Sequence, residues 1–223
     1  TFSEAVEALE IADFTVANGA LSALATADGG TTWTATFTPS ETTSETTNII
    51  TLADSFTDLA GNGGTGTSSA NYVVDTVVPT VAAMTLAADV AIGETTSLTV
   101  TFSEAVTDLE LGDFTATNGT LSDLASADGI TWTATFTPDV GVEGAGSVAL
   151  ADTYADLNGN GGTASTSNAI AVDTVAPTTA SIVLDDTDLV IGETAGVTIT
   201  FSEAVSSLDL TDFSSENGVL SNL

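Results

Sequence analysis

Hydrophobic and polar residues alternate along several short stretches of this chain. In Ser97–Phe102, the side chains of Leu98, Val100 and Phe102 fall on one face and hydroxyl groups fall on the other. Thr131–Phe136 alternates in the same way. A period of two residues is typical of a β-strand with one buried face, and Thr and Val are residue types favoured in strands. The pattern therefore predicts an all-β protein.

Residues 76–173 contain about seven such stretches, which Gly, Asn, Asp and Pro separate. We expect strands at roughly 80–86, 97–103, 113–118, 120–125, 130–137, 146–151 and 168–173. Seven short antiparallel strands in a unit of this length are typical of an immunoglobulin-like (Ig-like) β-sandwich. The chain has no Cys, so it lacks the disulfide that joins the two sheets of antibody domains.

The sequence repeats itself with offsets of 98 to 100 residues. TFSEAV occurs three times, and TWTATFTP, IGET, GNGG and DTV-x-PT occur twice each. A period of this length matches a whole small domain rather than a solenoid repeat. We therefore expect three tandem units: a partial unit at 1–75 that lacks its first strand and most of its second, a complete unit at 76–173, and a partial unit at 174–223 with the first three or four strands.

Two explanations of the incomplete outer units stay open. The chain is an excerpt of a longer tandem array, or neighbouring chains complete the partial units by donating strands. Residues 200–223 repeat the content of residues 1–24, so strand exchange would duplicate that segment. The duplication favours an excerpt.

Charge limits the functions that this composition allows. The 223 residues include 31 acidic residues and no Lys, Arg or His, which gives a formal net charge of −31. Phosphate binding relies on Lys and Arg, so we expect no nucleic-acid partner. Repulsion from anionic lipid, and the lack of an apolar run long enough to span a bilayer, predict no membrane insertion of this segment. Most catalytic nucleophile–base pairs cannot be built from these residues, so we expect no enzyme; a carboxylate-pair glycosidase is the remaining enzymatic alternative.

The same charge raises a problem of stability. Hydrophobic residues make up 43% of the chain, which is enough to form a core. Charges of one sign repel each other in a compact state, however, and no basic side chain offsets them. We expect cations from solution to do so.

Strand direction brings acidic residues together where two units join. In an antiparallel sandwich the second and sixth strands end at the same pole, and the preceding unit enters there. We therefore expect four acids at the first junction: Asp75, Glu104, Asp152 and Asp156, with Asp108 and Asp113 nearby. Several carboxylates at one place suit Ca²⁺, which prefers a shell of oxygen ligands.

Equivalent acids stand in the other units. Glu4, Asp54 and Asp58 occupy these positions in the first unit, and Asp173 and Glu203 mark the second junction. We predict Ca²⁺ as the cofactor that joins neighbouring units stiffly. Two alternatives remain: these acids are solvated strand ends and turn residues, or Na⁺ and K⁺ at high salt screen them without specific binding.

The loop that begins at Asp156 reads D-L-N-G-N-G, as at the start of a helix–loop–helix calcium site. The twelfth position is Ser167 rather than Glu, and the first unit has Ala60 where Asn158 stands. These departures exclude a full site of that kind. Asp156 and Asn160 also suit a tight turn without any metal.

Trp33 and Trp132 alternate in phase with Ala and Phe, which predicts that both indoles pack in the core. A sugar-binding platform is the alternative interpretation, and it requires an exposed indole.

TFSEAV, DF, NG-x-LS, TWTATFTP, the AGN-type loops and DTVAPT together resemble the bacterial Ig-like tandem repeats of large secreted surface adhesins, the extender repeats of the RTX-adhesin type. The resemblance covers essentially the whole chain. It implies secretion to the cell surface or the extracellular space, a stalk role and, in many members, calcium bound between domains.

The function that we predict is therefore a structural extender of a bacterial cell-surface adhesin, with neighbouring repeats of the same chain as partners. One alternative is a subunit of an extracellular filament or sheath, in which identical chains are the partners. A carbohydrate-binding module is the other.

Overall fold

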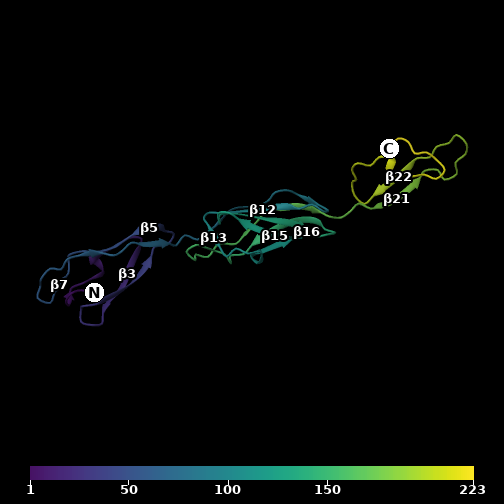
Figure 1. Ribbon diagram of the computed structural model, residues 1–223. Coiled ribbons are helices and arrows are strands. Elements are labelled where there is room, and N and C mark those ends of the chain that lie inside the picture. Colours follow the sequence, from purple (N-terminus) through teal and green to yellow (C-terminus); the bar gives the residue numbers. More distant parts are fainter.

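The computed structural model describes residues 1–223 as three β-rich bodies joined end to end (Figure 1). The N-terminus lies in the first body and the C-terminus in the third, near opposite ends of an elongated molecule (Figure 1). Each body corresponds to one of the repeats read from the sequence. The predicted all-β architecture is confirmed.

The second repeat is a complete sandwich. Its strands are β10 (Val81–Leu86), β11 (Val90–Ala91), β12 (Thr96–Phe102), β13 (Val106–Thr107), β14 (Phe114–Thr117), β15 (Gly119–Ser126), β16 (Thr131–Pro138), β17 (Glu143–Leu150), β18 (Ala155–Asp156), β19 (Ser165–Thr166) and β20 (Ile170–Asp173). One sheet has the order β10-β12-β16-β15, and the other has the order β11-β20-β17-β14 with β19 also paired to β17. A separate pair, β13–β18, lies near the end that receives the first repeat (Figure 1).

All seven strands expected for this repeat are present, as β10, β12, β14, β15, β16, β17 and β20. Four strands of two residues were not expected. Within this repeat the pairing is antiparallel except between β11 and β20, which run parallel. The two-residue strands are too short to show an alternating pattern.

Alternation builds the core of the second repeat. Leu98, Val100 and Phe136 are at most 1% exposed, and they belong to a cluster of 16 buried residues between the two sheets. Full burial of one such side chain contributes about 1.5–3 kcal/mol. Trp132 packs against this cluster and donates its indole N–H to the Gly129 carbonyl at 3.0 Å. The core position expected for Trp132 is confirmed.

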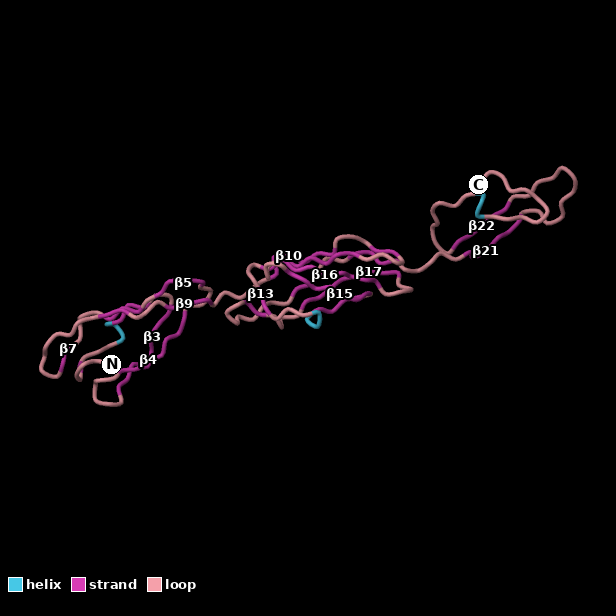
Figure 2. The backbone as a smooth tube through the Cα atoms, viewed as in Figure 1, coloured by secondary structure: helices cyan, strands magenta, loops and turns pink.

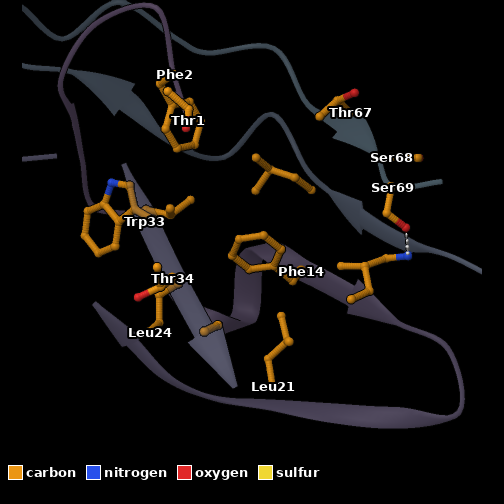
Figure 3. Close-up of a pocket in the computed structure, with 14 residues that line it drawn as sticks. Thr1, Phe2, Phe14, Leu21, Leu24, Trp33, Thr34, Thr67, Ser68 and Ser69 are labelled. Carbon is orange, nitrogen blue, oxygen red and sulfur yellow. Dashed lines mark hydrogen bonds between the residues drawn. The ribbon is translucent and has the colours of Figure 1, made fainter. Parts of the chain in front are cut away.

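The first repeat has the same plan with fewer strands. They are β1 (Val6–Glu7), β2 (Phe14–Val16), β3 (Gly19–Thr26), β4 (Trp33–Pro39), β5 (Ser44–Asn48), β6 (Ile50–Leu52), β7 (Thr57–Asp58), β8 (Thr67–Ser68) and β9 (Tyr72–Asp75). Counterparts of β10 and β12 are missing, and a hollow of about 350 Å³ lies beside β3 and β4. Phe14, Leu24 and Trp33 line it (Figure 3).

The third repeat contains β21 (Thr179–Leu184) and β22 (Val197–Phe201), which pair antiparallel in the register of β10 and β12. Without the sheet that covers β12 in the second repeat, Ile182, Leu184 and Val197 remain exposed.

Each repeat also has one short 3-10 helix, drawn in cyan in Figure 2. These helices are η1 (Ile11–Asp13), η2 (Leu111–Asp113) and η3 (Leu210–Asp212). None of the helices has the length and apolar character needed to cross a membrane.

Candidate metal centre at the junction of the first two repeats

Hydrogen bonds hold both ends of the linker between the first two repeats. Thr76 donates its backbone N–H to Thr43 O at 2.8 Å and its hydroxyl to Ser40 O at 2.7 Å, both in the first repeat. Thr80 donates its N–H to the Ser103 hydroxyl at 3.0 Å and accepts the Ser103 N–H at 2.8 Å, in the second. Only a few residues between them can change the angle between the repeats.

Asp75 stands at the start of this linker, as the last residue of β9. Its Oδ1 accepts the Val77 N–H at 3.2 Å, a local turn contact. Its Oδ2 accepts the side-chain amide of Asn158, from the second repeat, at 2.6 Å. One carboxylate of the first repeat therefore contacts both the linker and the next domain.

Glu104 and Asp156 approach Asp75 from the second repeat. Glu104 precedes β13, Asp156 ends β18, and the two strands pair with Val106 opposite Asp156. One carboxylate oxygen from each of Asp75, Glu104 and Asp156 lies within 4.8 Å of the others. We call these three residues the junction triad.

Asp156 is charged and only 3% exposed. Its Oδ1 accepts the backbone N–H groups of Asn158 and Asn160 at 2.8 and 2.9 Å, and its Oδ2 accepts the Asn160 side-chain amide at 2.7 Å. Burial alone would raise the pKa of Asp156, but these hydrogen bonds outweigh it and lower the pKa below its ordinary value. Asp156 is therefore held ionised at the junction.

Glu104 is half-buried and receives no hydrogen bond from the protein, in contrast to the two Asp residues of the triad. Burial raises its pKa, and the charges of Asp156 and Asp75 raise it further. Two negative neighbours thus oppose the ionisation of Glu104. Its oxygens are the free acceptors of the triad.

Two asparagines of the second repeat complete the contact with the linker. Asn160 donates its side-chain amide to the backbone carbonyl of Asp75 at 3.2 Å, in addition to its bond with Asp156. Asn158 donates to the Asp75 carboxylate. These inter-repeat contacts are not predicted by any sequence pattern, although the difference between Ala60 and Asn158 at equivalent positions of the two repeats is a signal for them.

The structure does not bring Asp152 into the triad. β17 ends at Leu150, and the chain then turns, so the alternation that predicted an inward Asp152 stops before it. Its side chain is exposed. Asp113 is also engaged elsewhere: it accepts the Glu110 N–H at 2.7 Å and the Thr153 hydroxyl. Asp108, exposed in a left-handed turn, is likewise outside the triad.

The predicted sites of the other repeats are less complete. Asp58 accepts the side-chain amide of Asn62 at 2.6 Å, as Asp156 does from Asn160, and Asp54 accepts the Gly66 N–H. Glu4 and Asp173 are exposed, and Glu203 is half-buried. No third acid joins Glu4 and Asp58, or Asp173 and Glu203, in a group of metal-ligand geometry.

The donor set of the triad fits a hard cation. All its side-chain ligands are carboxylate oxygens, and each oxygen can accept more than one contact, so the hydrogen bonds to Asp75 and Asp156 do not block coordination. A cation would also offset the repulsion that Glu104 experiences. Imidazole and thiolate ligands are absent from the chain, so the set suits Ca²⁺ or Mg²⁺ rather than Zn²⁺.

Comparison with known families agrees with the fold. The chain belongs to the bacterial Ig-like domain family, whose model matches residues 1–74, 75–172 and 173–223. These matches assign Asp75 and Asp173 to the repeat that follows, whereas the boundaries expected from the sequence repeats place each of them at the end of a unit. Domains of this family are commonly extracellular structural domains and are typically not enzymes. Comparison with curated proteins gave no match.

Proposed function

We propose that this chain is an extender segment of a bacterial cell-surface adhesin, in which Ca²⁺ at the junction triad stiffens the connection between repeats. The observation that supports this function is the meeting of Asp75 from one repeat with Glu104 and Asp156 from the next, within 4.8 Å. An ion shared between two domains resists bending, because bending separates its ligands.

Hydrogen bonds within the protein already hold this junction in place. Thr76 and Thr80 fix the two ends of the linker, and Asn158 and Asn160 hold Asp75 near the second repeat. Ca²⁺ would supply positive charge and coordination sites for oxygen. Glu104 receives no hydrogen bond from the protein, so its charge is the one that such an ion would offset most directly.

The overall form supports the same function. The three repeats lie in a row, and no bulky insertion interrupts the array (Figure 1). An acidic surface without basic residues keeps neighbouring stalks apart through like-charge repulsion. An extended, mutually repelling rod suits a part that spaces a binding domain away from the cell.

Calorimetry, thermal unfolding and small-angle X-ray scattering of residues 1–223 test the proposal together. After dialysis against chelator, added CaCl₂ should raise the unfolding temperature and lengthen the particle, whereas KCl at equal ionic strength should do less. Glu104→Gln should remove most of the calcium response. Asp152→Asn, outside the triad, should keep it. Superimposable melting and scattering curves in chelator and in CaCl₂ would refute the calcium-stiffened junction.

A further inference from the structure

Six asparagines of this chain are followed directly by glycine. They are Asn18, Asn62, Asn118, Asn158, Asn160 and Asn217. Asn–Gly is the dipeptide at which the following backbone nitrogen attacks the side-chain amide most easily, because glycine has no Cβ to hinder it. Asparagine is accordingly a chemically labile residue. Local structure decides which of the six can react.

Space for the cyclic intermediate differs between these sites. At Gly119, an added Cβ would lie 2.4 Å from the Phe136 ring, and Gly19 meets the Phe37 ring in the same way. These hairpin glycines are tightly packed. At Gly159 and Gly161, in contrast, no atom lies within 4 Å of an added Cβ. The open surroundings of Gly159 and Gly161, which Gly63 and Gly218 share, let the backbone rearrange toward a five-membered ring more easily than the packed hairpin glycines do.

Backbone hydrogen bonding leaves the glycine nitrogens of the loop after β18 available, as it does at the hairpin glycines, so the packing around each glycine is what separates the sites. Ladder bonds run from Asp156 N to Asn160 O and from Gly162 N to Tyr154 O, and the Gly161 N–H lies outside this ladder. The Gly159 N–H makes only a long bond of 3.3 Å to Asp156 O. Both nucleophilic nitrogens are therefore easily freed.

We infer that Asn158 and Asn160 are sites of spontaneous deamidation that rewrite the junction. The nitrogen of the following glycine bonds to the side-chain carbonyl carbon, the bond to the amide nitrogen breaks, and ammonia leaves with a proton from the glycine N–H. Water then opens the succinimide to aspartate or isoaspartate. The net reaction consumes one water and releases one ammonia, and it needs no oxidant or enzyme.

Conversion at these two positions turns an attractive interaction between the repeats into a repulsive one. Asn158 now donates to the Asp75 carboxylate and Asn160 to the Asp75 carbonyl. A carboxylate at either position cannot donate, and it places a further negative charge beside Asp75, Glu104 and Asp156. Repulsion then replaces attraction across the junction. Deamidation thus loosens the junction in the absence of cations.

The first repeat contains a natural comparison. Asn62, the counterpart of Asn160, donates to Asp58 within its own loop and touches no linker, and Ala60 stands where the second repeat has Asn158. Open space surrounds Gly63 as it does Gly161. Asn62 should therefore deamidate as Asn160 does, with no effect on the orientation of the repeats.

The covalent step can be tested without reference to any metal. The chain is incubated at mildly alkaline pH, folded and in chelator, and peptide mapping with isoaspartate-specific methylation follows each site. Acid should accumulate at Asn158 and Asn160 severalfold faster than at Asn18 and Asn118, and Gly161→Ala should slow conversion at Asn160 alone. Equal or faster conversion at Asn118 would overturn the inference.

The structural consequence is tested with the variants Asn158→Asp and Asn160→Asp, and with Asn62→Asp as the matched control. In chelator, scattering should show a wider range of inter-repeat angles for Asn158→Asp and Asn160→Asp than for the wild type. Asn62→Asp should show the same range as the wild type. An unchanged distribution would refute the loosened junction.

One expectation rests on the proposed function: adding CaCl₂ should restore the narrow range of inter-repeat angles in the Asn158→Asp and Asn160→Asp variants. If CaCl₂ acts on neither the wild type nor the variants, the calcium proposal fails while the deamidation result stands.

Discussion

Asp156 lies opposite Val106 in the register of β13 and β18, and the same relationship joins Asp58 to Val6 in the first repeat. This pairing gives the TFSEAV motif a structural role in both repeats. Its Val is buried in each and anchors the short strand pair. In the second repeat its Glu, two residues before the Val, has a carboxylate oxygen within 4.8 Å of one on the Asp of the partner strand.

Replacement of Glu104 by Gln should stabilise the second repeat at neutral pH when divalent ions are absent. The folded-state pKa of Glu104 is raised by burial and by Asp156 and Asp75. The folded protein therefore holds this proton to higher pH than the unfolded chain does, and stability is lost as pH rises through that interval. Gln carries no charge, so the variant escapes this loss. Urea unfolding in chelator at several pH values measures the difference.

Two conditions make the Glu104 prediction specific. Below the pH at which carboxyl groups ionise, the Glu104→Gln variant and the wild type should unfold at the same urea concentration. In excess CaCl₂ the order should reverse, because the wild type gains a ligand that the variant lacks. A variant less stable than the wild type in chelator at neutral pH would show that Glu104 has an attractive partner.

Removal of the Asn158 side chain should loosen the orientation of the first two repeats without unfolding either. Asn158→Ala deletes the 2.6 Å bond to the Asp75 carboxylate. An exposed hydrogen bond of this kind contributes about 1 kcal/mol, roughly a fivefold change in the population of the docked arrangement. Residual dipolar couplings of the two repeats report that population.

Asn62→Ala, at the position equivalent to Asn160, is a control for Asn158→Ala, because it disturbs the same loop of the first repeat without touching the linker. It should lower the stability of its own repeat and leave the inter-repeat angle unchanged. Equal couplings for Asn158→Ala and the wild type would mean that the bond from Asn158 to Asp75 does not set the orientation of the repeats.

The seven longer strands of the second repeat were predictable because each turns one face toward the core. Leu98, Val100 and Phe102 report a period of two directly, and their burial in the structure is nearly complete. The strand pair β13–β18 was not predictable in the same way, since two residues cannot display a period. Hydrogen bonds to neighbouring loops, from Val106 N to Gly129 O and from Gly162 N to Tyr154 O, hold that pair in place, and such contacts are a tertiary feature.

Proximity of Asp75, Glu104 and Asp156 could be predicted from strand direction alone, because that argument needs only the poles at which strands begin and end. Asp152 shows where alternation stops being informative: β17 ends at Leu150, so residues beyond it no longer point alternately to the two faces of the sheet. The amide contacts of Asn158 and Asn160 depend on how a loop folds onto the neighbouring repeat. No period in the sequence encodes that.

Loss of the Tyr154 hydroxyl should weaken the loop that carries Asp156. Tyr154 is 1% exposed; its hydroxyl donates to Thr163 O at 2.9 Å and accepts the Thr163 N–H at 3.1 Å. Tyr154→Phe leaves that peptide without its partner at a cost of about 1 kcal/mol. Thermal unfolding measures the loss, and hydrogen exchange should increase locally in residues 156–163.

The first repeat supplies the reverse experiment, since Phe56 occupies the place of Tyr154 and packs against Gly64 as Tyr154 packs against Gly162. Phe56→Tyr should be neutral or stabilising. A Tyr154→Phe variant as stable as the wild type, with unchanged exchange in the loop, would assign the Tyr154 hydroxyl no part in holding it.

Replacement by alanine should affect stability very differently at two adjacent glycines of this loop, Gly161 and Gly162. A Cβ on Gly162 would fall 2.1 Å from the Tyr154 ring, closer than any real contact, whereas one on Gly161 meets no atom within 4 Å. Neither glycine has a positive φ, so backbone strain does not distinguish them. Gly162→Ala must displace the buried ring and should cost about 1–3 kcal/mol, while Gly161→Ala should be nearly neutral. Chemical unfolding of both variants checks the pair; similar midpoints would mean that the ring moves aside freely, and that the loop bearing Asp156 is not anchored through Tyr154.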